Sequence, residues 1–303
     1  VIKSTGSWYY VKTGSGSILP CRIRGMFRNQ GIKATNPVAV GDIVTFSRVE
    51  GEETGVITGI DPRKNYLIRK SSRLSRQYQL IACNIDQVVL MATLREPQTH
   101  LEFIDRFLVS AEAYRIPAML IFNKIDLYDS DETLDLAAII SIYEDIGYPC
   151  YPISVSKNRG IKPVKDLLNE KTTVISGNSG VGKSSLLNLL DPQLNLKTNV
   201  VSNAHKAGKH TTTYAEMHEL PSGGNVIDTP GIKGFGTIDI EKDELFHFFP
   251  EIFRKSQECK FYNCLHINEP GCAVIEAVEK DEISETRYIS YVNLMEDMHE
   301  KYR

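Results

Sequence analysis

Residues 177–184 read Gly-Asn-Ser-Gly-Val-Gly-Lys-Ser, and this spacing constrains the fold more than any other feature of the chain. It matches the phosphate-binding loop pattern G-x-x-x-x-G-K-[ST] at every fixed position. Such a loop needs a buried strand before it and a helix after it. Residues 172–176 are rich in β-branched side chains, and residues 185–190 begin a helical pattern. We therefore predict a loop whose backbone N–H groups and following helix N-terminus converge on phosphate oxygens.

Two side chains of this loop have an expected chemical role. Lys183 is expected to reach the β- and γ-phosphates, and Ser184 to place its hydroxyl on Mg²⁺. The other predicted nucleotide-binding residues of the segment are Gly177, Asn178, Ser179, Gly180, Val181, Gly182 and Ser185. A glycine-rich turn beside an exposed lysine is the alternative.

Length and composition indicate an ordinary globular protein of more than one domain. The chain has 303 residues, of which 42% are hydrophobic and 24% charged, so we expect two or three domains with real cores. No apolar run approaches the length of a membrane span, and no apolar signal-peptide core opens the sequence. We therefore expect a soluble, cytoplasmic protein without a membrane partner.

The charge is segregated along the chain. Residues 1–80 hold 13 Lys/Arg against 5 Asp/Glu, a net of +8, whereas the remainder holds 22 against 33, a net of −11. A basic segment joined to an acidic body suggests that the basic part meets a polyanion, although a merely solvated surface is the commoner meaning of a charge run.

The first 70 residues predict a small all-β domain. Five short strands are expected at residues 8–11, 18–23, 42–49, 56–60 and 66–69, separated by glycines. This number suits a closed barrel of the oligonucleotide-binding (OB) type. Its predicted surface cations are Arg22, Arg24, Arg28, Lys33, Arg63 and Lys64, and its candidate platforms for stacked bases are Tyr9, Tyr10 and Phe27. Aromatic residues of a small barrel are more often core.

From residue 85 the pattern changes to strands alternating with helices, which predicts a mostly parallel sheet covered on both faces. The strand at residues 118–122 is followed directly by Asn123-Lys124-Ile125-Asp126, at the sheet edge where ligands bind. A carboxylate there can accept from both N1–H and the 2-amino group of guanine, so Asp126 is expected to select guanine. Asn123 is expected to brace the site, and the Lys124 stem to cover the ring.

Three later segments complete the expected nucleotide site. The loop Ser154-Val155-Ser156, with Ser154 and Val155 as its candidate site residues, occupies the place where guanine-binding proteins present a backbone N–H to guanine O6. The polar stretch 195–213 ends in Gly208-Lys209-His210-Thr211-Thr212-Thr213, and one threonine, taken here as Thr212, is expected to join the Mg²⁺ shell. Asp228-Thr229-Pro230-Gly231 follows a strand: Asp228 is expected beside Mg²⁺ and the Gly231 N–H on the γ-phosphate. The sequence does not choose among the three threonines.

Near the C-terminus, four side chains have the composition of a tetrahedral zinc site. They are Cys259, Cys264, His266 and Cys272. A Cys₃His set leaves no position for water, so we expect one structural Zn²⁺, with a reduced cysteine cluster as the alternative. The flanking segments are expected to be helical.

The order of these motifs is unusual. Asn-Lys-x-Asp at residue 123 precedes the phosphate loop at 177, which precedes Asp-x-Pro-Gly at 228, so the usual GTPase order is circularly permuted. With the basic barrel, the run from Gly208 to Thr213 and the zinc pattern, the whole chain resembles the small ribosomal subunit biogenesis GTPase RsgA (YjeQ) family. The resemblance implies a fold of three domains: an OB barrel at residues 1–72, a permuted α/β GTPase domain at 73–240, and a mainly helical zinc domain at 241–303.

The resemblance also implies an activity. Family members bind the 30S ribosomal subunit and its 16S rRNA late in maturation, hydrolyse GTP to GDP faster on the subunit, and are released on hydrolysis. The resemblance also assigns zinc to the Cys₃His set. The expected oligomeric state is a monomer. Ile232 follows Gly231 where Ras-like proteins have a water-positioning glutamine, so His210, or less favourably His205, is our candidate for that role. Two rivals are a nucleotide-regulated RNA-binding module with incidental hydrolysis and a P-loop ATPase.

Overall fold

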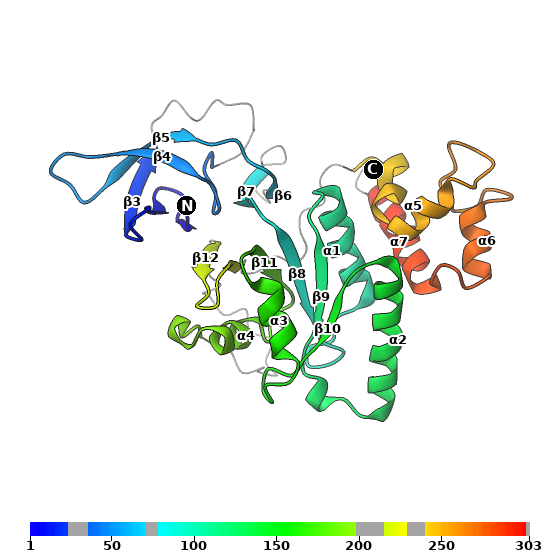
Figure 1. Ribbon diagram of the computed structural model, residues 1–303. Coiled ribbons are helices and arrows are strands. Elements are labelled where there is room, and N and C mark those ends of the chain that lie inside the picture. The colour runs from blue at the N-terminus through cyan, green and yellow to red at the C-terminus, as the bar shows by residue number, and fades with distance from the viewer. Residues whose placement is uncertain (24–35, 71–77, 198–214, 229–239, 301–303) are drawn as a thin grey trace.

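The computed structural model describes residues 1–23, 36–70, 78–197, 215–228 and 240–300. Figure 1 shows three regions: a β-rich region formed by the start of the chain, a central sheet flanked by helices, and a helical region at its end. Within the described residues, no helix is both long and apolar enough to cross a bilayer. The predicted domain limits at residues 72/73 and 240/241 stay predictions.

The N-terminal region is a small barrel-like sheet built on period-two alternation. Its strands are β1 (Lys3–Ser4), β2 (Tyr9–Lys12), β3 (Ile18–Ile23), β4 (Val44–Arg48) and β5 (Gly55–Ile60). Alternate residues point inward, and the core holds Tyr9, Val11, Leu19, Cys21, Val38 and Ile57. Tyr9 is only 2% exposed, so its suggested role as a base-stacking platform is wrong. Phe27, Arg24, Arg28 and Lys33 lie outside the described residues.

The strand expected to close the barrel belongs elsewhere. β6 (Tyr66–Lys70) pairs with β7 (Tyr78–Cys83) in a separate two-stranded sheet. Arg63, which precedes this sheet, is also not the free surface cation that we expected. Its guanidinium donates to both carboxylate oxygens of the buried Asp42 at 2.7 Å. Charge counting could not reveal this pair, because the two residues are brought together only by the fold.

The central sheet is mostly parallel, as predicted. Its strands are β8 (Gln87–Ala92), β9 (Ala118–Phe122), β10 (Cys150–Pro152), β11 (Thr172–Ser176), β12 (Glu216–Glu219) and β13 (Asn225–Asp228). They lie in the order β10-β9-β8-β11-β13-β12, with β12 antiparallel to β13 and the other pairs parallel. The carboxyl ends of the parallel strands therefore meet at one edge, where the connecting loops carry the predicted site residues.

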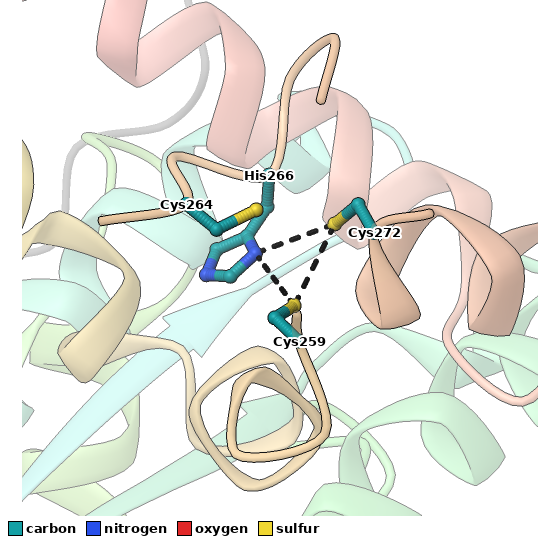
Figure 2. Close-up of side chains that lie close together, drawn as sticks. All are labelled: Cys259, Cys264, His266 and Cys272. Atoms are coloured by element: carbon teal, nitrogen blue, oxygen red, sulfur yellow. Dashed lines mark hydrogen bonds between the residues drawn. The ribbon is translucent and has the colours of Figure 1, made fainter. Parts of the chain in front are cut away.

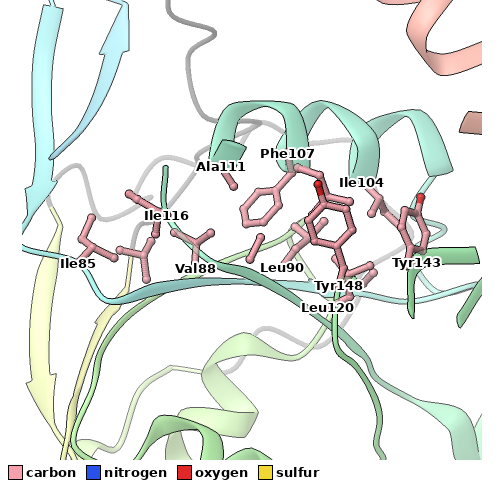
Figure 3. Close-up of a cluster of buried hydrophobic side chains, with 14 of the residues drawn as sticks. Ile85, Val88, Leu90, Ile104, Phe107, Ala111, Ile116, Leu120, Tyr143 and Tyr148 are labelled. Carbon is pink, nitrogen blue, oxygen red and sulfur yellow. The ribbon is translucent and has the colours of Figure 1, made fainter. Parts of the chain in front are cut away.

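Helices cover both faces of this sheet because successive strand residues point to opposite sides. One face packs α1 (Leu101–Ala113) and α2 (Ser130–Ile146), and Figure 3 shows Phe107 and Ile104 of α1 lying over Val88, Leu90 and Leu120. The other face packs α3 (Ile161–Leu168) and α4 (Lys183–Leu190) against a second cluster. Short 3₁₀ turns, η2 (Ile125–Leu127) and η3 (Pro192–Leu194), follow β9 and α4.

The barrel and the central sheet are joined edge to edge. β1 pairs antiparallel with β12, so that Lys3 lies opposite Glu216, and the N–H of Met217 donates to the carbonyl oxygen of Ile2 at 2.8 Å. Ion pairs from Lys3 to Glu216, at 3.0 Å, and from Lys12 to Glu219 flank this junction. The result is one continuous sheet of eleven strands. Figure 1 shows β12 at the side of the central sheet that faces the N-terminal strands.

The C-terminal region is mainly helical, as predicted. It contains η4 (Lys242–Phe248), α5 (Pro250–Ser256), α6 (Ala273–Glu279) and α7 (Glu285–Glu300) around a core of its own. Val109 of α1 belongs to the same core. This helical region is therefore packed directly on the helix that covers the central sheet.

Arg287 on α7 is the polar centre of that contact and is 1% exposed. It donates to Asp105 of α1 at 2.7 Å and to Glu251 of α5 at 2.7 and 3.2 Å, and its guanidinium lies 4.6 Å from the ring centroid of Phe249. The hydroxyl of Tyr143 donates to the same oxygen of Asp105 at 2.8 Å. One arginine thus neutralises two carboxylates withdrawn from water.

We expect Arg287→Ala to lower the free energy of unfolding by about 3 to 5 kcal/mol, because Asp105 and Glu251 would lose their cation while staying buried. Arg254→Ala is the matched control, since Arg254 is exposed and its guanidinium donates to the carbonyl oxygen of Pro250 in its own helix; it should change stability by less than about 0.5 kcal/mol. Urea unfolding followed by circular dichroism measures both. Equally small losses of unfolding free energy in the two variants would contradict a structural role for the buried network.

Candidate functional site

The phosphate-binding loop joins the end of β11 to the start of α4, as the sequence predicted. Two of its glycines are required by their surroundings. Gly177 has φ +145°, and a Cβ there would lie 2.3 Å from the carbonyl oxygen of Met91. Gly182 has φ +103°, and a Cβ would lie 2.4 Å from the amide nitrogen of Asn123. Only glycine allows the loop to pass this close to its neighbours.

Lys183, the first residue of α4, folds back over this loop. Its ammonium donates to the carbonyl oxygens of Gly177 at 2.6 Å and Asn178 at 2.8 Å. Burial lowers the pKa of Lys183, and the negative charge of Asp228 opposes that shift. A partly desolvated cation held at the loop is suited to a phosphate group, whose charge would compensate its burial.

Asn123, at the end of β9, connects the two halves of the site. It is 3% exposed. Its side-chain nitrogen donates to the carbonyl oxygen of Val181 in the phosphate loop at 2.8 Å, and its side-chain oxygen accepts from the N–H of Val155 at 3.1 Å. The amide therefore holds the phosphate loop and the predicted base-contacting loop at a fixed separation.

Asp126 lies in η2, and both of its carboxylate oxygens accept from serine hydroxyls. Ser154 donates to Oδ1, and Ser156 donates to Oδ2 at 2.9 Å. These bonds, that of Ser154 first, lower the pKa of Asp126 and keep it ionised. Ser156 belongs to the loop that the sequence places at the guanine, but its bond to Asp126 was not predicted. Lys124 has φ +67°, and its ammonium donates to the carbonyl oxygen of Glu96.

A cavity of about 470 Å³ lies between Asp126 and the phosphate loop. A volume of this order suits a small organic ligand. The cavity is lined by Asn123, Lys124, Asp126, Leu127, Val155, Ser156, Ser179, Gly180, Gly182, Lys183, Ser184, Ser185 and Lys197. Most of the residues predicted to bind nucleotide are thus brought to one place, and Leu127 and Lys197 are additions without a sequence signal.

The remaining predicted nucleotide residues are placed only in part. Asp228 ends β13, in register with Ile175 of β11, so it reaches the same sheet edge as the phosphate loop. His210, Thr212, their neighbours in the run 208–213, and Gly231 lie outside the described residues. Their roles stay predictions, as do those of the residues that line the cavity.

The Cys₃His set forms a compact cluster (Figure 2). The ligand atoms of Cys259, Cys264, His266 and Cys272 all lie within 4.8 Å of one another. The Sγ atoms of Cys259 and Cys272 are 3.8 Å apart, and Nδ1 of His266 lies 3.5 and 3.4 Å from them. Tetrahedral zinc, with Zn–S bonds of about 2.3 Å and Zn–N bonds of about 2.0 Å, requires separations of about 3.8 and 3.5 Å. The donor set and its geometry therefore fit one zinc ion.

Polar contacts hold the loop that carries this cluster. The Glu269 carboxylate accepts from the N–H groups of Leu265, Ile267 and Asn268 at 2.8 to 3.1 Å. The hydroxyls of Tyr288 and Tyr291 on α7 donate to the carbonyl oxygens of His266 at 2.8 Å and Leu265 at 2.6 Å. The metal ligands are thus fixed to the same helix that carries Arg287.

Sequence comparison with known proteins gives matches along the whole chain. Residues 1–57 match the model of the RsgA N-terminal domain, and residues 60–238 match that of the RsgA GTPase. The chain is 53% identical to the small ribosomal subunit biogenesis GTPase RsgA 2 of Bacteroides thetaiotaomicron, over 100% of this chain and 98% of that protein. It is 51% identical to RsgA of Flavobacterium johnsoniae, over 100% and 94%.

Two solved structures share the fold. YjeQ from Thermotoga maritima aligns with a TM-score of 0.78 and 36% identity, over 98% of this chain and 96% of that one. YloQ, described as a circularly permuted GTPase, aligns with a TM-score of 0.76 and 36% identity, over 99% and 94%. In this chain too, Asn123 and Asp126 precede the phosphate loop. The permuted order, the cavity between these motifs and the matches along the sequence establish that the chain belongs to the RsgA GTPase family.

Proposed function

We propose that this chain hydrolyses GTP to GDP and phosphate while bound to the small ribosomal subunit, and that this assists the late maturation of the subunit. The observation that carries the proposal is the double hydrogen bond of Asn123, which holds the phosphate loop and the loop at Val155 around one cavity. The relatives named as small ribosomal subunit biogenesis GTPases, matched over 94% to 98% of their lengths, support the assignment of the partner.

In this proposal the two ends of the cavity recognise the two ends of the nucleotide. The Asp126 carboxylate accepts from N1–H and the 2-amino group of guanine, and the Val155 N–H faces O6. The stem of Lys124 covers the ring. Lys183 and the N–H groups of the phosphate loop neutralise the phosphates, which is the main requirement of phosphoryl transfer to water.

We assign the Mg²⁺ that accompanies GTP to the Ser184 hydroxyl and, through water, to Asp228. Asp228 ends β13, which pairs with β11, and Ser184 is the second residue of α4, the helix that the phosphate loop joins to β11. Bound Mg²⁺ supplies charge to the transferring phosphoryl group. Thr212 and the N–H of Gly231 complete this assignment in the γ-phosphate state, and His210 orients the attacking water.

We further propose that the basic barrel contacts 16S rRNA, that the chain acts as a monomer in the cytoplasm, and that the zinc is structural. Arg22 supports the first assignment, because its guanidinium lies 4.3 Å from the ring centroid of Trp8 on the barrel. A guanidinium stacked on an indole is a suitable surface for an unpaired base. Trp8 was not among our candidate platforms.

The test is GTP turnover by the purified protein alone, with 30S subunits and with 50S subunits. We expect 30S to raise the rate at least about tenfold, because a partner must order the catalytic groups when no glutamine follows Gly231. The 50S subunit should have no effect. Lys183→Ala, which removes the phosphate-binding cation, is the control and should abolish turnover in all three conditions.

Two outcomes would overturn the proposal. Equal, slow turnover in all three conditions would remove the ribosomal assignment. Strong 30S binding with the same dissociation rate in GTP and in a non-hydrolysable analogue would favour the RNA-binding module with incidental hydrolysis.

A further inference from the structure

A short basic segment, residues 157–165, follows the predicted base-contacting loop. It reads Lys-Asn-Arg-Gly-Ile-Lys-Pro-Val-Lys, with four cations and no acid, although the chain beyond residue 80 has a net charge of −11. Lys157, Arg159, Lys162 and Lys165 are all exposed. Among the described residues, none of the four forms an ion pair. By contrast, α2 carries five carboxylates and no cation.

The backbone of the basic segment is fixed. The N–H of Ser154 donates to the carbonyl oxygen of Arg159 at 3.0 Å, and the N–H of Arg159 donates back to that of Ser154 at 2.9 Å. Gly160 has φ +70°, and a Cβ there would lie 2.6 Å from the carbonyl oxygen of Pro152. Ile161 and Val164 are buried in the core under α3. The four cations are therefore presented on a defined surface.

This surface has the chemistry of a phosphate-binding face. A hollow of about 470 Å³ is lined by Asn158, Gly160, Ile161, Lys162, Pro163 and Lys165, so its polar side chains are one amide and two ammonium groups. Ile161 and Val164, the two large apolar residues of the segment, are buried, so neither offers an exposed anchor. A protein partner would need an apolar or aromatic anchor. A nucleic-acid backbone needs only cations and hydrogen-bond donors.

We propose that the basic segment binds the phosphate backbone of RNA in the small ribosomal subunit. The inference rests on the proposed attachment to that subunit and adds a contact outside the barrel. It also gives the subunit a short route to the nucleotide. The N–H of Lys157 donates to Ser154 Oγ at 3.1 Å, and the same hydroxyl donates to Asp126. RNA bound at Lys157 thus contacts the loop that holds the guanine carboxylate.

The test is the double variant Lys162→Gln/Lys165→Gln, which removes two charges and leaves the hydrogen bonds at Ser154 intact. Its affinity for 30S subunits is measured in a non-hydrolysable GTP analogue at salt concentrations between 50 and 200 mM. We expect binding about tenfold weaker, and a slope of log K against log salt that is smaller by about 2, since each lost phosphate contact removes about one released counterion.

Two controls accompany the double variant. Lys260→Gln/Lys280→Gln removes the same charge from exposed positions in the C-terminal region and should leave the slope unchanged. The affinity of the Lys162/Lys165 variant for fluorescent GDP without subunits should equal that of the wild type, because neither lysine lines the nucleotide cavity.

The outcomes separate this inference from the proposed function. Failure of the wild type to bind 30S would overturn both. If the wild type binds 30S but the Lys162/Lys165 variant keeps the same affinity and slope, the proposed role of the basic segment is overturned and the proposed function stands. The same holds if the two double variants lose affinity equally. A photocrosslinking residue in place of Lys165 should form a crosslink to 16S rRNA. A crosslink to a ribosomal protein instead would overturn the RNA assignment.

Discussion

Asp126→Asn is expected to lower the affinity for GTP by about three orders of magnitude and to create affinity for xanthosine triphosphate. The carboxylate accepts two hydrogen bonds from the guanine edge, whereas the asparagine amide presents a donor in place of one acceptor. Sites built on such bonds reject a mismatched partner strongly, because buried polar groups are left unpaired. Xanthine carries a carbonyl where guanine has its amino group, so the amide can donate to it.

The measurement is equilibrium titration of the purified variant with fluorescent guanosine and xanthosine diphosphates. Asp131→Asn, at an exposed position on the first turn of α2, removes one carboxylate without touching the cavity and should bind GDP like the wild type. An Asp126→Asn protein that binds GDP normally and ignores xanthosine nucleotides would contradict the guanine assignment. It would favour the P-loop ATPase instead.

Loss of one zinc ligand is the second change expected to have a large effect. Structural zinc contributes about 10 to 16 kcal/mol of binding free energy in small domains, and much of this is folding energy. Cys259, Cys264, His266 and Cys272 provide the ligand set, and the metal would be what ties the segment between them together. We therefore expect Cys272→Ser to lose the zinc and to unfold residues 259–272 locally, while the apolar core around α5, α6 and α7 and the central sheet stay intact.

Zinc content by mass spectrometry and limited proteolysis measure the two parts of this prediction. The wild type should carry one zinc per chain and resist cleavage in its C-terminal region. Cys150→Ala is the matched control, because Cys150 is buried in the central core away from the cluster and should leave the zinc content at one. Full zinc content in Cys272→Ser, or a zinc-free wild type, would refute the site.

The predictable parts of the structure have local signals. Residues 88–92 of β8 and all of β9 are continuous apolar runs, and their burial follows from that composition. The loop from Gly177 to Gly182 was readable because its conformation requires glycine at fixed positions. The guanine and zinc motifs were found in the same way, through residue types that few other roles require.

The features that were missed depend on partners distant in sequence. Arg287 reads as a surface residue of an amphipathic helix, and only the packing of α1 and α5 buries it against two carboxylates. Ser156 lies in the predicted base-contacting loop, but its hydroxyl meets Asp126 only because the pairing of β10 with β9 brings the two loops together. The two-residue strand β1 has no periodicity at all. It pairs with β2 on one side and, on the other, with β12, which lies more than two hundred residues further along the chain.

That pairing of β1 with β12 also imposes an order on biosynthesis. Lys3 leaves the ribosome early, but Glu216 is added after more than two hundred further peptide bonds have formed. During this interval the outer edge of the barrel sheet has no strand to pair with, and unpaired edges are where nascent chains associate wrongly. Translation of the central domain therefore has to reach its last strands before the first domain is protected. In this protein the N-terminal domain is begun first and completed late.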